Sequence, residues 1–107
     1  MSTVAGTEPL AARGVDVVFA LPAALRPFAG GRAEVACTIP RGTVRDALHA
    51  LVAVHPGVVD RVLDERGEVR RHVNVFVDGE NIRFTELLAT PVPAGATITI
   101  VAAVSGG

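Results

Sequence analysis

The sequence lacks lysine, tryptophan and tyrosine, and its ten basic residues are all arginines. Because no side-chain amine is present, copies of this chain cannot be joined to one another through lysine side chains, and only the α-amine could accept such a bond. The single cysteine, Cys37, excludes an internal disulfide and suits the reducing cytoplasm, which is where we expect the protein. Aromatic residues make up only 4% of the chain, so its core must consist of Val, Leu, Ile and Ala with four Phe.

Strong charge and long apolar runs are absent as well. The formal net charge of -1 provides no long-range attraction for phosphate backbones or anionic lipid, so we expect neither nucleic acid nor membrane as a partner. No apolar run approaches the ~20 residues that span a bilayer. Residues 1–9 have neither the basic start nor the apolar centre of a signal peptide. The 107 residues predict one domain at 14–104, after a loose leader at 1–13 and before a tail at 105–107.

Alternation of apolar and polar residues predicts strands at 15–21, 33–39, 72–77 and 97–104. The first two should form a hairpin around an irregular loop at 22–32, whose Gly30-Gly31 pair we interpret as a flexible tip rather than a phosphate-binding loop. Residues 80–89 are less readable, and 81–84 fit either a short strand or a turn. The residues predicted to point inward from the first two strands are Val15, Val17, Phe19, Leu21, Val35, Cys37 and Ile39.

A helix should begin at Thr43, because Thr43 and Asp46 have the spacing of a capping box. It should end before Pro56, since the residue that precedes a proline resists the helical conformation. A short second helical turn at 57–63 and a charged, exposed loop at 64–68 follow. The residues predicted on the buried face of the main helix are Val44, Leu48, Leu51, Val52 and His55.

The predicted order is strand, strand, helix, strand, short strand, strand. One helix across a mixed sheet is an α+β arrangement, and this order matches the ubiquitin-like β-grasp fold, with a mixed four- to five-stranded sheet packed on one main helix. We expect the first and last strands to be adjacent and parallel in the middle of the sheet. The segment after residue 104 would then leave from the most rigid strand.

The chain's last four residues, 104–107, offer little chemistry except a terminal carboxylate. Gly106 and Gly107 have no Cβ that would keep them out of a narrow tunnel, and they accept φ of either sign. When extended, residues 104–107 span roughly 10–14 Å. They can therefore enter a partner's active site, although a terminal Gly-Gly can equally be a frayed end.

Several segments resemble one family. Residues 95–107 resemble the end of small bacterial sulfur carriers related to ThiS and to the small subunit of molybdopterin synthase. Residues 72–84, residues 88–90, and the Leu-Pro and Leu-Arg-Pro groups before Gly30-Gly31 narrow the resemblance to the branch that forms cysteine, the CysO-type carriers. The similarity covers residues 15–107.

This resemblance implies a substrate protein rather than an enzyme. An ATP-dependent activating enzyme would adenylate the Gly107 carboxylate, and sulfur transfer would leave a thiocarboxylate there. In the cysteine branch, the thiocarboxylate attacks an aminoacrylate on the pyridoxal phosphate of a partner synthase, and the thioester rearranges to an amide-linked cysteine. A zinc metalloprotease then releases cysteine. ATP, pyridoxal phosphate and zinc would belong to these partners, and the chain itself needs no cofactor or metal.

Other residues carry weaker hypotheses. Cys37 could hold a persulfide, but its predicted inward position favours a packing role. The three histidines (His49, His55 and His72) lack the spacing of a metal site and fit surface or capping roles. An apolar patch on the outer face of the sheet is a sharper candidate, because exposed patches of this kind mark partner sites. Its predicted members are Val18, Ala20, Phe76, Val101 and Ala103.

Two rival functions stay open at this point. A ubiquitin-like modifier, joined through Gly107 to lysines of other proteins, needs the same adenylation and the same Ser105-Gly106-Gly107 tail. A plain interaction domain would need neither. Among sulfur carriers, the final acceptor could equally be thiamine thiazole, molybdopterin or a secondary metabolite, because composition and periodicity do not distinguish these branches.

Overall fold

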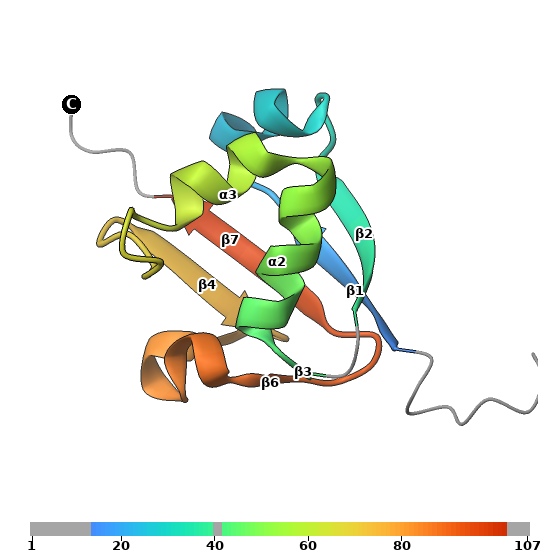
Figure 1. Ribbon diagram of the computed structural model, residues 1–107, viewed down its shortest axis with the longest axis vertical. Coiled ribbons are helices and arrows are strands. Elements are labelled where there is room, and N and C mark those ends of the chain that lie inside the picture. Colours follow the sequence, from blue (N-terminus) through green and yellow to red (C-terminus); the bar gives the residue numbers. More distant parts are fainter. Residues whose placement is uncertain (1–13, 40–41, 103–107) are drawn as a thin grey trace, which may run out of the picture.

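Five strands form the central sheet of the computed structural model, which describes residues 14–39 and 42–102. In chain order they are β1 (Val15–Ala20), β2 (Glu34–Ile39), β4 (Val73–Val77), β5 (Glu80–Asn81) and β7 (Thr97–Ala102). Their spatial order is β2-β1-β7-β4-β5, with β1 parallel to β7 and the other pairs antiparallel (Figure 1). The predicted hairpin and the predicted central parallel pair are both confirmed.

The main helix, α2 (Val44–Val54), begins at the predicted capping box. The Thr43 amide donates to Asp46 Oδ2 over 2.8 Å, and the Asp46 amide donates to Thr43 Oγ1 over 3.4 Å. A second helix, α3 (Pro56–Val62), follows directly and starts with its proline at the first helical position, where the missing N–H costs nothing. None of the helices in the described ranges has the length and hydrophobicity that crossing a membrane requires.

One predicted core residue of α2 is on the surface. Val52 is 41% exposed, whereas Val44, Leu48 and Leu51 are fully buried. At 3.6 residues per turn, Val52 lies about a quarter turn away from the centre of the buried face. Ala47, which the prediction omitted, occupies that face instead and is fully buried.

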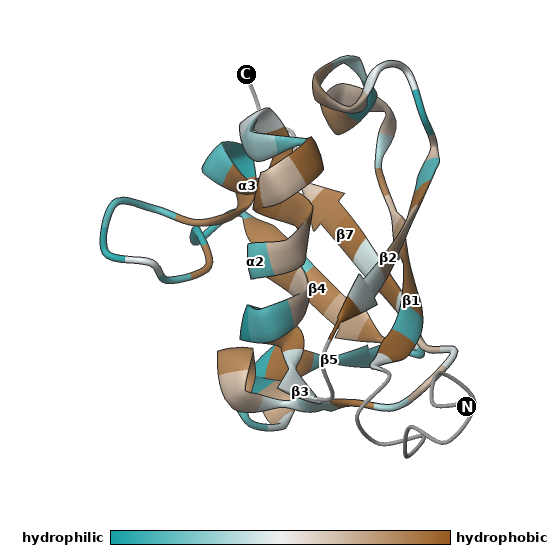
Figure 2. Cartoon of the chain, turned by 45° about the vertical axis from the view of Figure 1, so that its right-hand side comes forward, coloured by the Kyte–Doolittle hydropathy of each residue, from teal (hydrophilic) through white to brown (hydrophobic). Residues whose placement is uncertain are grey.

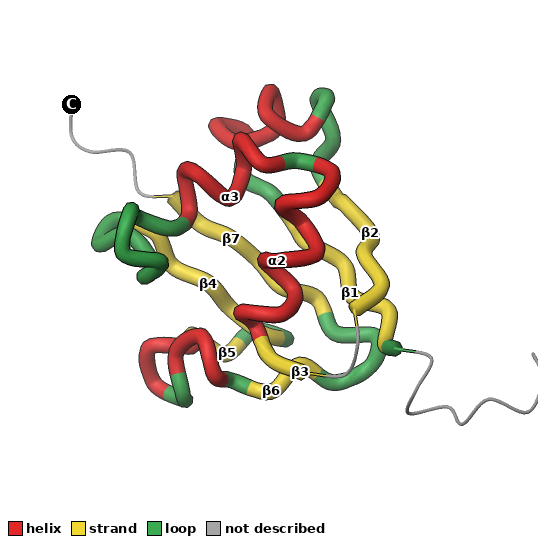
Figure 3. Tube along the Cα trace, in the orientation of Figure 1, coloured by secondary structure: helices red, strands yellow, loops and turns green. Residues whose placement is uncertain are grey.

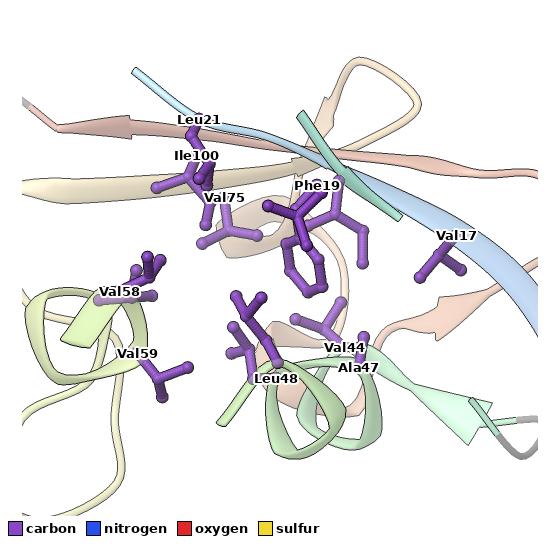
Figure 4. Close-up of a cluster of buried hydrophobic side chains, with 14 of the residues drawn as sticks. Val17, Phe19, Leu21, Val44, Ala47, Leu48, Val58, Val59, Val75 and Ile100 are labelled. Carbon is purple, nitrogen blue, oxygen red and sulfur yellow. The ribbon is translucent and has the colours of Figure 1, made fainter. Parts of the chain in front are cut away.

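The core lies between the sheet and the two helices. Phe19 on β1 points toward Leu48 of α2, and Val58 of α3 lies against the β4 and β7 side (Figure 4). Figure 2 shows the apolar residues on the facing sides of α2 and the strands, while the loop after α3 is hydrophilic. The inward parity predicted for β1 and β2 is confirmed, although Val15 and Cys37 are only partly buried.

Five short elements were not predicted as such. The segment expected to be an irregular loop contains a 3-10 helix, η2 (Ala23–Ala29), because Leu25 and Ala29 are buried together and Gly30 closes the helix at φ 66°. Residues 81–84, left open between strand and turn, include η3 (Ile82–Phe84), and η4 (Leu87–Ala89) follows (Figure 3). A two-stranded sheet joins β3 (Gly42–Thr43) to β6 (Pro91–Val92).

The capping box makes stability depend on pH. Hydrogen bonds, above all from the Thr43 amide, hold the pKa of the Asp46 carboxyl below its usual value. A lowered pKa in the folded state stabilises the fold above the unfolded pKa of about 3.9, and this contribution is lost as pH falls through the folded pKa. We expect Asp46→Asn to lower the melting temperature near neutral pH but to have little effect near pH ~2.

Gly42 provides a second test of the same capping box. A Cβ there would overlap the Asp46 carboxylate and lie 2.8 Å from its Cγ, so Gly42→Ala should displace the carboxylate. We expect Gly42→Ala and Asp46→Asn together to cost no more than the larger single change, because both remove the same interaction. Additive losses of unfolding free energy, measured by denaturant titration, would contradict this account.

Candidate functional site

The site begins where β7 ends. β7 lies in the middle of the sheet, between β1 and β4, and its last residue, Ala102, pairs with Val73 at the start of β4. β1 runs parallel to β7, so the chain enters the sheet at Gly14 at the end opposite Ala102 (Figure 1). Ser105, Gly106 and Gly107, the predicted reactive tail, lie outside the described residues, as does Ala103. The structure thus describes the base from which the tail continues.

Arg83 of η3 is hydrogen-bonded to β4 and to the segment before it, beside the end of β7. Its Nη2 donates to the Val73 carbonyl over 2.8 Å and to the Arg70 and Arg71 carbonyls over 3.3 Å each. Its Nε donates to Asn74 Oδ1 over 3.2 Å. The guanidinium therefore ties η3 to the strand that pairs with the last described rung of β7. Sequence reasoning missed this role, because no local pattern shows an arginine reaching carbonyls more than ten residues away.

The outer sheet face carries the predicted apolar residues. Val18, Ala20 and Phe76 are half-buried, and Val101 is 44% exposed. They alternate with core residues of the same strands, so they point away from α2. Thr99 of β7 is the cross-strand partner of both Ala20 and Phe76, so threonine interrupts the apolar surface. This group of four residues is called the outer-face patch below.

A groove opens beside the end of β7, on the same side of the sheet as the helices. Its open volume is about 900 Å³, and its lining comes from η2, α3 and the turn after it, the segment before β4, and the end of β7. Phe28 of η2 packs against Gly57 of α3, and the Arg61 guanidinium lies 3.6 Å from the centre of the Phe28 ring. Called the exit groove below, it is lined by Ala24, Leu25, Phe28, Asp60, Arg61, Leu63, Asp64, Glu65, Arg70, His72 and Ala102.

The exit groove could not be read from the sequence. It unites residues 24–28, 60–72 and 102, which are far apart in the chain and which local patterns present only as a loop, a short helix with a charged turn, and a strand. The only local signal was the acidic pair Asp64 and Glu65 after a helix, which is usually a solvated surface. The contact between Phe28 and Gly57 packs η2 against α3. It depends on tertiary structure alone, so no local pattern predicts it.

The other candidate side chains have ordinary surroundings. Cys37 is partly buried against the core, and this burial raises the pKa of its thiol. A raised pKa lowers the thiolate fraction, which opposes a persulfide role. His49 and His72 are exposed, and His55 caps the end of α2. Among residues 14–39 and 42–102, no group of three or more His, Cys, Asp or Glu side chains is placed to hold a metal ion.

Comparison with known proteins gives one consistent result. The sequence profile of the ThiS family matches residues 20–107. The sulfur carrier protein CysO of Mycobacterium tuberculosis is 34% identical over 95 residues, which cover 87% of this chain and all of that protein. Small archaeal modifier protein 1 of Haloferax volcanii is 42% identical over 65 residues, covering 61% of this chain and 70% of that protein.

The solved structures agree with the sequence comparison. A chain in the BexX/CysO complex of Amycolatopsis orientalis superposes with a TM-score of 0.75 at 33% identity, over 85% of this chain and 99% of that one. The fold is therefore the ubiquitin-like β-grasp, as expected. Carriers of this kind are acted on by enzymes and are not enzymes themselves. The chain belongs to the ThiS family of sulfur carriers and related modifiers.

Proposed function

We propose that this protein carries sulfur on the carboxyl group of Gly107 for the formation of cysteine. The observation that supports this most is the match of the ThiS family over residues 20–107, which includes the complete Ser105-Gly106-Gly107 tail. The tail continues from the central strand β7, whose last described residue is held against β4. A rigid base and a slender tail suit delivery of one carboxylate into several different active sites.

The proposed chemistry starts from an unreactive carboxylate. Its oxygen attacks the α-phosphorus of ATP, which releases pyrophosphate and leaves an acyl-adenylate on Gly107. Sulfide attacks the acyl carbon, and AMP departs as the leaving group. The sulfur stays as a thiocarboxylate, a better nucleophile than the carboxylate that it replaced. ATP is bound by the activating enzyme, so none of these steps requires a cofactor on this chain.

The cysteine branch is supported by the mycobacterial CysO relative, which matches along its whole length. In this branch the thiocarboxylate adds to an aminoacrylate held by a pyridoxal-phosphate synthase. The resulting thioester rearranges to an amide, and a zinc metalloprotease releases cysteine and restores Gly107. We place this cycle in the cytoplasm. Carriers for thiamine thiazole, molybdopterin or a secondary metabolite would share the first two steps.

A second function is favoured by one specific observation. Small archaeal modifier protein 1 is 42% identical to this chain over 65 residues, whereas CysO is 34% identical over 95 residues. A modifier would use the same adenylate but transfer the Gly107 acyl group to a lysine amine of another protein. The absence of lysine from this chain prevents lysine-linked chains of the modifier itself, but it leaves attachment to other proteins possible.

Reconstitution tests the sulfur-carrier proposal. The purified protein is incubated with the host's activating enzyme, ATP and a sulfide donor, and then with the pyridoxal-phosphate synthase and an activated serine. We expect first the replacement of one oxygen by one sulfur on Gly107, and then a species that is one cysteine residue heavier than the unmodified protein, because the carried sulfur becomes the thiol of that cysteine. A thiocarboxylate that forms but never acquires cysteine would reject the cysteine branch while keeping the carrier.

The outer-face patch is proposed as part of the surface that meets the activating enzyme. Phe76 is half-buried on this face and pairs across the ladder with Thr99, so aspartate there can be solvated without opening the core. We expect Phe76→Asp to raise the KM for the carrier in ATP–pyrophosphate exchange by about tenfold or more, since loss of a buried aromatic contact commonly costs over ~1 kcal/mol.

Phe84→Asp is the matched control for this change. Phe84 is 83% exposed in η3 and does not belong to the outer-face patch. We expect its replacement to leave the KM within about twofold, as expected for a residue outside an interface. Equal effects of both changes would count against the patch. Loss of the cooperative unfolding transition in Phe76→Asp would show that Phe76 is a core residue instead.

A further inference from the structure

The exit groove lies where any enzyme that acts on Gly107 has to approach. Ala102 lines the groove and is the last described residue of β7. From Ala102, residues 103–107 extend at most roughly 16–18 Å. If the enzyme's reactive centre lies in a recess, part of residues 103–107 has to lie inside the enzyme. The enzyme's surface around the entrance to its active site must therefore come close to the residues beside Ala102.

The chemistry of the groove indicates what this surface contains. Its apolar part comes from η2 and from Leu63 at the end of α3, and it includes Phe28, which is 38% exposed although the ring packs on Gly57. The Arg61 guanidinium lies over the Phe28 ring, and the part of Phe28 that stays exposed in this concave surface is suited to contact an apolar side chain.

Some charged side chains of the groove already make contacts within the chain, and others do not. Both arginines are engaged: Arg61 stacks on Phe28 and donates to the Gly57 carbonyl over 3.2 Å, and Arg70 donates twice to the Asp60 carbonyl, over 3.1 and 3.2 Å. Asp64 accepts from the backbone amides of residues 66 and 68, which holds the pKa of its carboxyl below the usual value.

Two carboxylates of the groove can still bind a partner. Asp60 and Glu65 are exposed, and within the part of the chain that the structure describes their side chains make no hydrogen bond or ion pair. Arg61 and Arg70 keep their positive charge, so three carboxylates against two guanidiniums leave the groove a small negative excess around its apolar floor. Asp60 and Glu65 are the carboxylates of the groove that can still accept hydrogen bonds from a partner. A complementary surface combines apolar side chains with lysine or arginine.

We propose that the exit groove docks a basic and apolar segment at the active-site entrance of the activating enzyme, with Asp60 and Glu65 as the charged contacts. This inference rests on the proposed adenylation of Gly107 and adds a second contact surface to the outer-face patch. The two surfaces lie on opposite faces of the sheet. The exit groove borders the end of β7 at Ala102, and the outer-face patch reaches that end at Val101. Together they orient the carrier about the direction of its tail.

Charge reversal tests the groove. The double variant Asp60→Arg and Glu65→Arg is compared with wild type in ATP–pyrophosphate exchange, using the host's activating enzyme at about 0.02 M and about 0.5 M salt. We expect the KM for the carrier to rise about tenfold or more at low salt and the difference to shrink at high salt, with kcat within about twofold. Asp60→Asn with Glu65→Gln should act in the same direction but less strongly.

The matched control changes the same net charge elsewhere. Glu80→Arg with Glu86→Arg alters two exposed carboxylates of β5 and the segment before η4, and it should leave the KM within about twofold. The groove proposal would be overturned by an unchanged KM in the groove variant or by an equal rise of the KM in the control. It would also be overturned if the rise were the same at low and high salt. Wild-type protein that supports no exchange would instead contradict the proposed function, and the groove proposal with it.

Discussion

Deletion of Gly106 and Gly107 should abolish adenylation while leaving the domain folded. The carboxylate would then sit on Ser105, about 7 Å short of its natural reach. Misplacement of a reacting group by even 1 Å can cost about a hundredfold in rate. We therefore expect ATP–pyrophosphate exchange to fall by at least about a hundredfold, with unchanged unfolding free energy, because the described sheet ends at Ala102.

A second variant separates tail length from tail shape. Gly106→Ala with Gly107→Ala keeps the full reach and the terminal carboxylate but adds two Cβ atoms. If the activating enzyme receives the tail in a narrow tunnel, this variant should lose at least about tenfold in kcat/KM, yet retain more activity than the deletion. Full activity of the deleted chain would show that the tail is incidental and would favour the plain interaction domain.

The largest effect on stability should come from Phe19→Ala. Phe19 is fully buried on β1, next to the central strand that leads to the tail. Truncation of a buried phenylalanine costs about 3–5 kcal/mol, which is a large part of the ~5–15 kcal/mol that holds a domain folded. We expect the midpoint of denaturant unfolding to fall steeply, and adenylation at elevated temperature to fall with it.

Phe84→Ala is the control for this change. The Phe84 side chain is 83% exposed, so its removal creates no cavity and should shift the unfolding free energy by no more than about 0.5 kcal/mol. Urea titration of both variants measures the difference. Comparable losses in the two variants would mean that β1 does not carry the core in the way described here.

The fold followed closely from local patterns in the sequence. Alternation gave the faces of β1 and β2, and the Thr43 to Asp46 spacing gave the start of α2. The errors arose where tertiary contacts decide. Val52 lies at the edge of a helical face, where only the packing partner settles exposure. The segment that forms η2 contains prolines and glycines typical of loops, and it becomes helical because Leu25 and Ala29 are buried together.

The candidate site was only partly predictable. The central position of β7 could be inferred from the order of elements, and the outward direction of Phe76 from the alternation of its strand. Arg83 and the exit groove could not, since both depend on residues brought together from distant segments. The roles of Gly107 and of the outer-face patch, and the limits of the domain at residues 14 and 104, stay predictions.

The intact mass of the protein, purified gently from its own host, tests the central claim most directly. We expect a species in which one oxygen has been replaced by one sulfur, localised to Gly107 by fragmentation. A second species with one added cysteine residue at Gly107 would identify the cysteine branch. The contrary result is free protein of unmodified mass only, together with its Gly-Gly remnant on lysines of other proteins. That outcome would establish a modifier and reject the sulfur carrier.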